Sequence, residues 1–241
     1  MSYLKMNDYS CLKGKTAFIT GATGAIGGEI AQSLSSAGVD LLINGTNLEK
    51  LQQIKGKLTT NVHIIDGDIS EQSEVERILD ESTSVGKVDI LVNCAGVFPQ
   101  KPISELDTSE YQKLMNINLN APYFLSAGFS KDMIKNGWGR IVNIGSASSY
   151  GGYKNTVAYC SSKHGLLGMS LAMHDELKED GVRVYCISPS STQGDMGLAT
   201  KGQDYSTFLD PKEVADYVLF AISQDGNAMS QEIFIKRMHL R

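Results

Sequence analysis

The chain has 241 residues, a length that fits one large domain or two small ones. A hydrophobic fraction of 41% excludes global disorder, and a net charge of −5 without any run of five basic residues argues against a nucleic-acid or anionic-membrane surface. No apolar run approaches the ~18 residues of a transmembrane helix, and the first residues lack the apolar core of a secretory signal.

Short apolar runs alternate with helical patterns through the first half of the chain. The helical pattern that starts at Ala25 stops at Gly38, and Asn47 suits the N-cap of the next helix. In chain order, the predicted elements are a strand over 16–20, a helix over 25–37, a strand over 41–43, a helix over 47–58, a strand over 62–65, a helix over 70–80 and a strand over 88–92.

The second half continues the same alternation. Pro211 suits the first turn of a helix, and Gly181 closes the long helix before it. The predicted elements are a helix over 108–136, a strand over 140–144, a helix over 156–179, a strand over 182–187, a helix over 211–222 and a strand over 232–235. Near-continuous apolar strands joined by helices predict an α/β fold. We expect one domain over 1–241, a doubly wound Rossmann-type parallel sheet of about seven strands with helices on both faces.

The segment 190–209 interrupts this regular pattern. It contains Gly194, Gly197 and Gly202 and few residues suited to a core. A glycine-rich segment after a strand near the carboxyl edge of the sheet is a candidate lid over a substrate. The alternative is a disordered connector.

A glycine-rich turn follows the first predicted strand. Gly21, Gly24 and Gly27 lie between that strand and the first helix. Glycine permits a tight turn and a close approach of backbone to pyrophosphate, and a helix N-terminus offers free N–H groups to an anion. The turn therefore predicts a dinucleotide site, and the alternative is a sharp connection without a ligand.

The end of the second strand bears on the type of dinucleotide. NAD sites usually place an acidic residue there to bind the ribose hydroxyls. This chain has Asn44, Gly45 and Thr46 at that point, and Asp40 lies at the other end of the strand. The acid that would repel a 2′-phosphate is missing, so NADP is favoured over NAD, although the expected arginine is missing too.

Four polar residues form a candidate catalytic set. Tyr159 and Lys163 are four residues apart on a predicted helix and share a face. Ser146 follows the fifth strand, and Asn118 lies in the preceding long helix. A tyrosine can protonate the oxygen of a carbonyl that accepts hydride, and a serine hydroxyl can hold it. A nearby lysine should lower the pKa of the tyrosine from its ordinary value near 10.

At this point the chain resembles the short-chain dehydrogenases/reductases over essentially its whole length. Within that family it looks most like the bacterial 3-oxoacyl-[acyl-carrier-protein] reductases, through GRIVNIGS at 139–146 and YCSSKHGLLGM at 159–169. The matching family motifs are TGATGAIG at 20–27, DI at 68–69, NCAG at 93–96, NIN at 116–118, GS at 145–146 and YCSSK at 159–163.

The resemblance implies a role for each residue of the catalytic set. Tyr159 would be the general acid, Lys163 would bind the nicotinamide ribose, Ser146 would orient the substrate carbonyl, and Asn118 would hold a water in a proton relay. Tyr159 and Lys163 would also touch the cofactor. The other implied cofactor contacts are Gly21, Thr23, Gly24 and Ile26 at the turn, Thr46 at the adenosine ribose, Asp68 and Ile69 at adenine, Asn93, Ala95 and Gly96 along the ribose, and Thr192 at the nicotinamide amide.

The chain departs from the family pattern in several places. Ala25 replaces the middle glycine of the turn, and Gly24 stands where many NADP enzymes have a basic residue. Ser190 follows Pro189 where the family has glycine, and Gly194 replaces a threonine. The C-terminal sequence lacks the usual Asp-Gly-Gly ending. These last differences concern the substrate edge and leave the catalytic set intact.

Function follows from the set and the resemblance together. We expect an NADP(H)-dependent reductase of a 3-oxoacyl thioester on acyl carrier protein, working as a homotetramer or homodimer. The alternatives are a reductase or dehydrogenase of another small ketone, aldehyde, sugar or hydroxy acid, and a non-catalytic cofactor-binding protein. An acidic carrier protein would need a local basic patch such as Lys131, Lys135 and Arg140, residues that could equally be a solvated helix face.

The cysteines are spread along the chain without a Cys-x-x-Cys pair. Such spacing suits neither a zinc site nor a disulfide framework. We therefore expect a cytoplasmic protein without a bound metal. The four are Cys11, Cys94, Cys160 and Cys186.

Overall fold

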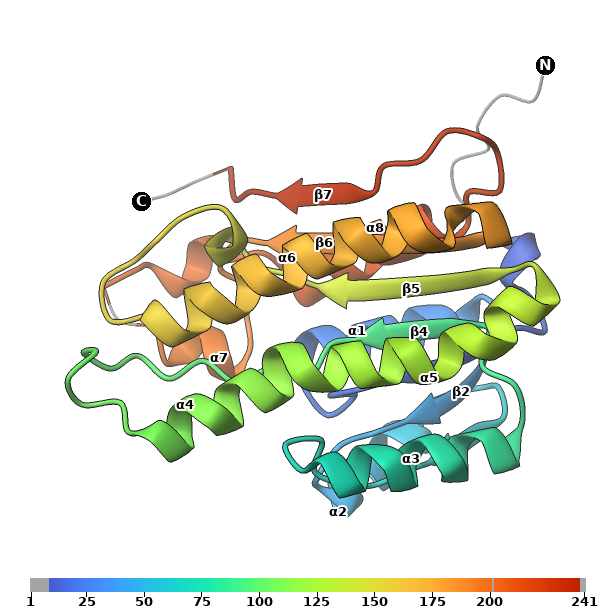
Figure 1. Ribbon diagram of the computed structural model, residues 1–241, viewed down its shortest axis with the longest axis horizontal. Coiled ribbons are helices and arrows are strands. Elements are labelled where there is room, and N and C mark those ends of the chain that lie inside the picture. Colours follow the sequence, from blue (N-terminus) through green and yellow to red (C-terminus); the bar gives the residue numbers. More distant parts are fainter. Residues whose placement is uncertain (1–8, 201, 239–241) are drawn as a thin grey trace.

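A computed structural model describes residues 9–200 and 202–238 (Figure 1). Seven parallel strands form one sheet in the order β3-β2-β1-β4-β5-β6-β7. This confirms the predicted doubly wound α/β fold. The strands are β1 (Thr16–Ile19), β2 (Asp40–Ile43), β3 (Val62–Ile64), β4 (Ile90–Asn93), β5 (Gly139–Ile144), β6 (Val182–Pro189) and β7 (Glu232–Ile235).

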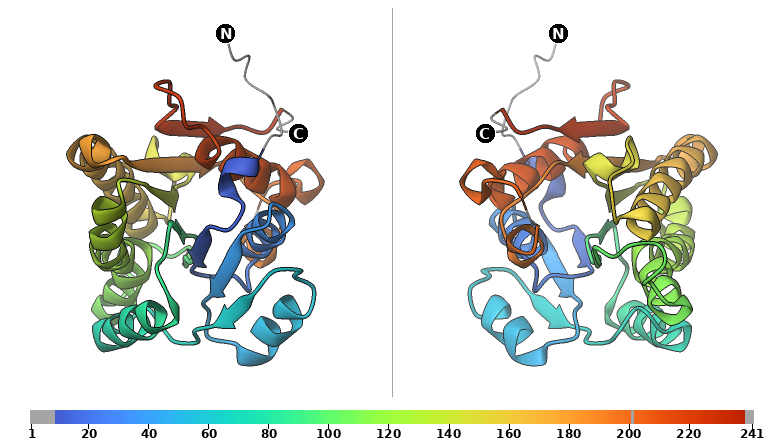
Figure 2. Two further views of the ribbon diagram at one scale, coloured as in Figure 1. Left: turned by 90° about the vertical axis from the view of Figure 1, so that its right-hand side faces the viewer. Right: turned by 90° about the vertical axis from the view of Figure 1, so that its left-hand side faces the viewer.

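Helices cover both faces of the sheet, as Figure 2 shows in the two end views. Helices α1 and α2 with α8 lie on one face, and α3, α5 and α6 lie on the other. The helices are α1 (Ala25–Ser36), α2 (Leu48–Lys55), α3 (Gln72–Val85), α4 (Thr108–Met115), α5 (Ala121–Asn136), α6 (Val157–Leu177), α7 (Asp195–Leu198) and α8 (Pro211–Ile222). Among the described residues, no helix has the length and apolar character needed to cross a membrane.

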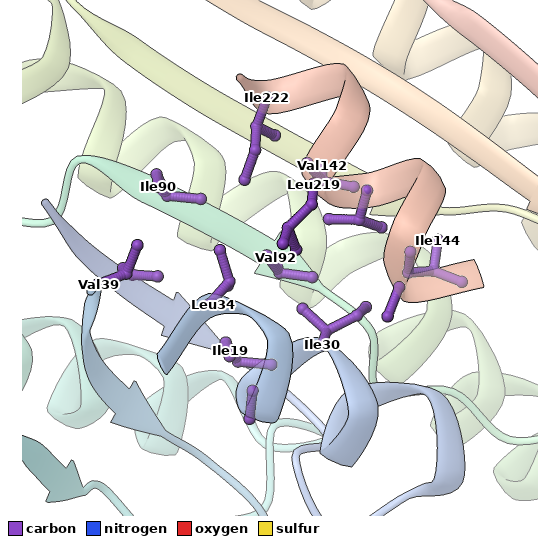
Figure 3. Close-up of a cluster of buried hydrophobic side chains, with 14 of the residues drawn as sticks. Ile19, Ile30, Leu34, Val39, Ile90, Val92, Val142, Ile144, Leu219 and Ile222 are labelled. Carbon is purple, nitrogen blue, oxygen red and sulfur yellow. The ribbon is translucent and has the colours of Figure 1, made fainter. Parts of the chain in front are cut away.

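Side chains that alternate along the strands pack into two separate hydrophobic cores. Ile19 of β1 packs toward α1 and α8, where Ile30 and Leu219 meet the sheet (Figure 3). Phe18, its neighbour in β1, points to the opposite face and meets Phe129 of α5, with ring centroids 5.2 Å apart. Because successive strand side chains point to opposite faces, the short apolar runs bury both faces of the sheet.

Local capping sets the start of several helices. Asn47 accepts a hydrogen bond from the Lys50 amide, which confirms the predicted N-cap of α2. Asp210 caps α8 and Pro211 occupies its first turn, as expected. Helix α3 begins at Gln72 rather than at 70, because Asp68 accepts the Ser70 amide at 2.9 Å and holds that stretch in a turn.

The long helix expected over 108–136 is interrupted. A single π-helical turn, Asn116–Asn120, separates α4 from α5. π-Helical turns inside α-helices are frequent at functional sites. Hydrophobic periodicity did not predict this turn, since it inserts without breaking the apolar pattern on either side.

The position of Arg140 contradicts the predicted surface patch of basic residues. It was a candidate for an exposed basic patch, but its side chain is only 1% exposed. It pairs with Asp225 and lies over the Trp138 ring, 4.3 Å from the centroid. Arg140 sits near the start of β5, away from the carboxyl end where Ser146 follows, so it cannot form a surface patch for an acidic partner.

Candidate functional site

The site lies at the carboxyl edge of the sheet, where the strand order reverses between β1 and β4. Ligands of doubly wound proteins bind in the crevice formed at such a reversal. The arrowheads of β4 and β5 point to the edge where α4 begins and α7 lies (Figure 1). Thr20, just after β1, accepts the amides of Cys94 and Ala95 at 3.0 and 3.1 Å, so its hydroxyl joins the ends of the two central strands.

The glycine-rich turn has no room for side chains at its two critical glycines. Gly21 has φ +65, and a Cβ there would lie 2.7 Å from the Ala95 Cα. A Cβ on Gly27 would lie 2.3 Å from the Gly21 carbonyl oxygen. Helix α1 starts at this turn with no side-chain cap and no acidic residue in its first turn. The free amides and positive end of the helix dipole therefore suit an anion such as a pyrophosphate.

The end of β2 lies against this turn. The Asn44 side chain is buried and donates to the Ile65 carbonyl at 2.9 Å, so it ties β2 to β3 and does not face a ligand. A Cβ on Gly45 would lie 3.3 Å from the Thr23 side chain, which places the two positions side by side. Thr46 is exposed beside them. No acidic side chain stands at 44–46.

The two residues expected at adenine differ in their surroundings. Asp68 is partly exposed, and its carboxylate lies 3.6 Å from the Lys113 ammonium. Burial acts to raise the pKa of Asp68, but hydrogen bonds from Ser70 and the charge of Lys113 outweigh it and lower that pKa. Asp68 is therefore ionised at neutral pH. Ile69 is buried in the core between the sheet and α3.

The side chain of Asn93 points into the protein interior. Its side-chain Nδ2 donates to Asn143 Oδ1 at 2.8 Å, and the side chain is 2% exposed. Asn143 in turn donates to Ser170 of α6 at 2.9 Å. The Asn93 side chain therefore joins β4 to β5, and through Asn143 to α6.

Asn118, Gly96 and Lys163 come together. A Cβ on Gly96 would lie 3.5 Å from Asn118 Oδ1 and 4.0 Å from Lys163 Nζ. Asn118 forms a pair of hydrogen bonds with the backbone of Val97, both 3.0 Å long, and also donates to Ser162 Oγ. The π-helical turn aims this side chain at the segment after β4, so its partners come from another part of the chain and not from its own helix.

Tyr159 is buried at the centre of the set. The ring of Phe98 packs edge-on against it, with centroids 4.5 Å apart, and Leu114 completes the apolar cluster. Burial raises the pKa of Tyr159, while a hydrogen bond with Ser146 lowers it. The net direction is upward, opposite to the lowering expected from the spacing to Lys163. The reason is that burial outweighs the other contributions.

Ser146 has two roles in the structure. Its Oγ accepts the Ser148 amide at 3.1 Å and caps the short 3₁₀ turn Ala147–Ser149. The same side chain forms the hydrogen bond with Tyr159. The capping interpretation and the catalytic one are therefore compatible, because the cap fixes the hydroxyl beside the tyrosine.

Lys163 is buried and its ammonium donates to the Ile144 carbonyl at 2.7 Å. Its Nζ lies 5.8 Å from the centre of the Tyr159 ring. Burial lowers the pKa of Lys163 to about 8, against the opposing effect of Cys186 and Cys94. The lysine is thus a buried cation near neutrality, held at the carboxyl end of β5.

The segment 190–209 is folded in its described part and does not form a disordered connector. Thr192 pairs with Leu209, and the Gln193 amide donates to the Leu209 carbonyl at 2.9 Å. A Cβ on Gly194, where φ is +132, would lie 2.7 Å from the Ala25 Cβ. The segment therefore reaches the N-terminus of α1, and the two departures at Ala25 and Gly194 lie in contact. Below, this segment is called the lid.

A groove of about 250 Å³ borders the apolar cluster that contains Tyr159, through Leu106 and Ala158, although Tyr159 itself does not line it. It runs between the segment after β4 and the start of α6. The sequence patterns did not predict the roles of Phe98 and of this groove. The one sequence feature that points to Phe98 is that an aromatic residue stands two positions after Gly96. The apolar side chains that line the groove include Pro99, Ile103, Leu106, Val157 and Ala158.

Comparisons with known proteins agree with this geometry. The family model described as short chain dehydrogenase matches residues 15–204. The 3-oxoacyl-[acyl-carrier-protein] reductase FabG of Rickettsia conorii is 32% identical over 225 residues, which cover 90% of this chain and 92% of that protein.

Two solved structures are similar along nearly the whole chain. A metagenomic short-chain oxidoreductase in complex with NADP has a TM-score of 0.84 and 26% identity, covering 95% of this chain and 100% of its own. A Beutenbergia cavernae protein, proposed to be an NAD(P)-dependent gluconate 5-dehydrogenase and holding NADP at low occupancy, has a TM-score of 0.86 and 26% identity, covering 95% and 96%.

Proposed function

Because the chain belongs to the short-chain dehydrogenase family, it is an oxidoreductase of carbonyl and alcohol groups, and we propose that it reduces a 3-oxoacyl thioester on acyl carrier protein with NADPH. The observation that carries this proposal is the cluster of the buried Tyr159 and Lys163 with the half-buried Ser146 at the carboxyl edge of the sheet. A bound nicotinamide would supply the hydride.

Each side chain of the cluster has a task in carbonyl reduction. The Tyr159 hydroxyl donates its proton to the carbonyl oxygen as negative charge develops there, and its raised pKa keeps that proton in place at neutral pH. Ser146 holds the same oxygen by a hydrogen bond. Lys163 provides a buried positive charge and hydrogen-bond donors for a ribose, and Asn118 holds a water that returns a proton from solvent.

The dinucleotide would lie along the carboxyl edge of the sheet. We assign its pyrophosphate to the first turn of α1, with Gly21, Thr23, Gly24 and Ile26 around it. Thr46 would meet the adenosine ribose, Asp68 and Ile69 the adenine, and Thr192 the nicotinamide amide. Ala95 and the backbone of Asn93 and Gly96 would pass along the other ribose.

NADP is the preferred dinucleotide in this proposal. No carboxylate stands at 44–46 to repel a 2′-phosphate, and two similar structures hold NADP. We expect Gly45→Asp to lower the ratio of kcat/KM with NADPH to that with NADH by about tenfold or more, the effect of roughly 1.4 kcal/mol of charge repulsion.

Gly45→Asn is the matched control for this change. Its side chain has nearly the same shape and meets the same crowding at Thr23, where a Cβ lies 3.3 Å away, but it has no charge. The ratio should stay near the wild-type value in the asparagine variant. An equal shift in both variants would mean that crowding, and not charge, changes the cofactor preference. No shift in either variant would contradict the inference that the residues at the end of β2 select between NADPH and NADH.

The acyl substrate is supported by the similarity to the Rickettsia reductase and by the apolar part of the groove that borders the Tyr159 cluster. The second candidate is a sugar acid or another hydroxy acid. It is favoured by the similar structure proposed to be a gluconate 5-dehydrogenase and by the departures in the lid at Ser190 and Gly194.

An assay of cofactor oxidation distinguishes the candidates. The protein is mixed with an acetoacetyl thioester and either NADPH or NADH at equal concentration. Fast turnover with NADPH is the expected result. Turnover only with keto acids and NADPH, or with gluconate and NADP⁺ in the reverse direction, would select the second candidate. Binding of NADPH without turnover of any ketone with NADPH, or of any alcohol with NADP⁺, would support a non-catalytic protein.

A further inference from the structure

The end of β7 and the segment that follows it form hydrogen bonds with the lid. The Ser190 amide donates to the Ile235 carbonyl at 2.8 Å, and the Arg237 amide donates to Ser190 Oγ at 3.0 Å. The side chain of Arg237 then extends over the lid. Its Nη1 donates to Thr207 Oγ1 at 3.1 Å and its Nη2 to Gln203 Oε1 at 2.7 Å.

An aromatic contact adds to these hydrogen bonds. The guanidinium carbon of Arg237 lies 4.9 Å from the centre of the Phe208 ring. Such cation–π contacts favour arginine, whose flat group can stack while its N–H groups stay bonded at the edge. One side chain thus contacts three lid residues that lie close together in sequence but are separated from Arg237 by the whole of α8 and β7.

Contacts inside the lid connect Arg237 to the cofactor turn. Gln203 Oε1 also accepts Ser191 Oγ at 3.1 Å, so it joins Arg237 to the exit of β6. The Gly194 amide donates to the Tyr205 hydroxyl at 2.8 Å. Gly194 in turn lies against Ala25, at the first residue of α1. Holding the 203–208 stretch therefore also holds the part of the lid nearest the turn.

The geometry of the guanidinium, and not an ion pair, distinguishes this contact. Among the described residues, no carboxylate forms an ion pair with Arg237, and both of its side-chain acceptors are neutral. A planar fork can reach Gln203 and Thr207 together, whereas a lysine ammonium is a single point donor on a flexible stem. The contact should consequently not survive replacement by lysine.

We propose that Arg237 is a positioning residue, which holds the lid against the carboxyl edge of the sheet so that the lid can close the substrate side of the site. This role rests on the proposed function, because a lid matters only where a substrate is bound. It gives the chain's C-terminal segment a part in the reaction without contact to the reacting atoms.

Hydrogen exchange measured by mass spectrometry tests the structural half of this proposal without any substrate. In Arg237→Ala and in Arg237→Lys, the amides of Gln193, Gly194 and Leu209 should exchange about tenfold faster than in the wild type, because local opening becomes easier. Peptides of β5 should not change. Lys236→Ala is the control, since Lys236 lies over Phe234 of β7 and not over the lid.

Wild-type exchange of the lid in Arg237→Ala would overturn the proposal, and so would wild-type exchange in Arg237→Lys together with faster exchange in Arg237→Ala. The second result would mean that positive charge and not the fork holds the lid. Equal loss of protection in Lys236→Ala and Arg237→Ala would also overturn it, because the effect would then belong to the end of the chain as a whole.

Kinetics test the functional half on the substrate found for the wild type. Arg237→Ala should raise KM for the carbonyl substrate about tenfold with a smaller change in kcat, and Gln203→Ala should do the same more weakly. Their double variant should be no worse than Arg237→Ala, because both changes break one contact. Additive losses would overturn the proposal. A wild type without turnover would instead contradict the proposed function, while hydrogen exchange still decides whether Arg237 holds the lid.

Discussion

Tyr159→Phe is expected to lower kcat/KM for carbonyl reduction by about 10³-fold, within the range that positioned general acids contribute. The phenyl ring keeps the packing against Phe98, where ring centroids are 4.5 Å apart, and removes only the hydroxyl that hydrogen-bonds Ser146. Binding of NADPH should therefore stay close to the wild-type value, measured by fluorescence titration. Steady-state kinetics with the substrate of the wild type give the loss.

Tyr217→Phe provides the matched control for this variant. Tyr217 lies on α8 and is 45% exposed, on the opposite face of the sheet from α6. The same loss of a hydroxyl there should leave kcat/KM unchanged. Near-wild-type activity of Tyr159→Phe would show that another group protonates the substrate oxygen and that the proposed mechanism is wrong.

Lys163→Met is expected to reduce kcat/KM by about 10²-fold or more, because the proposed site loses its buried cation. The same change should alter the pH dependence of stability. The pKa of Lys163 is about 8 in the folded protein, against an ordinary value of 10.5. Between these values the unfolded chain binds the extra proton, so the stability of the wild type rises with pH across that window.

The variant lacks this group and should not show the rise. Its stability relative to the wild type should thus be greatest at pH 8 and below, and should decline by at most about 3 kcal/mol as pH increases from 8 to 10.5. Urea unfolding at several pH values measures the difference. The exposed Lys135→Met serves as control, with no trend expected. A constant difference between wild type and Lys163→Met would contradict a buried lysine with a lowered pKa.

Local sequence patterns determined much of the fold and of the candidate site. The strand–glycine–helix order around Gly21 predicted the turn at the start of α1, because the requirement for positive φ and for close backbone approach is local. The four-residue spacing of Tyr159 and Lys163 placed both on α6, since helical periodicity depends only on neighbours along the chain. Apolar runs likewise predicted all seven strands to within a few residues.

Burial and contacts between distant segments could not be predicted in this way. The spacing of Tyr159 and Lys163 suggested a lowered tyrosine pKa, but Phe98 packs on the ring from another segment and burial raises that pKa instead. Arg140 was predicted to be a surface cation, but its side chain is buried and pairs with Asp225. Neither the burial of Tyr159 nor that of Arg140 produces a periodic pattern in the sequence around the buried residue.

The lid shows the same division most clearly. Its glycines were visible in the sequence and indicated a loop near the site, but not whether the loop was ordered. The contacts that join it to Arg237 span 30 positions from Thr207 and 34 positions from Gln203, so no local sequence pattern reveals them. The sequence by itself thus determined which elements form and which residue types stand at the carboxyl edge. Only the tertiary structure decided how deeply those side chains are buried and which distant residues contact the segment 190–209, because these depend on packing between segments that local periodicity does not relate.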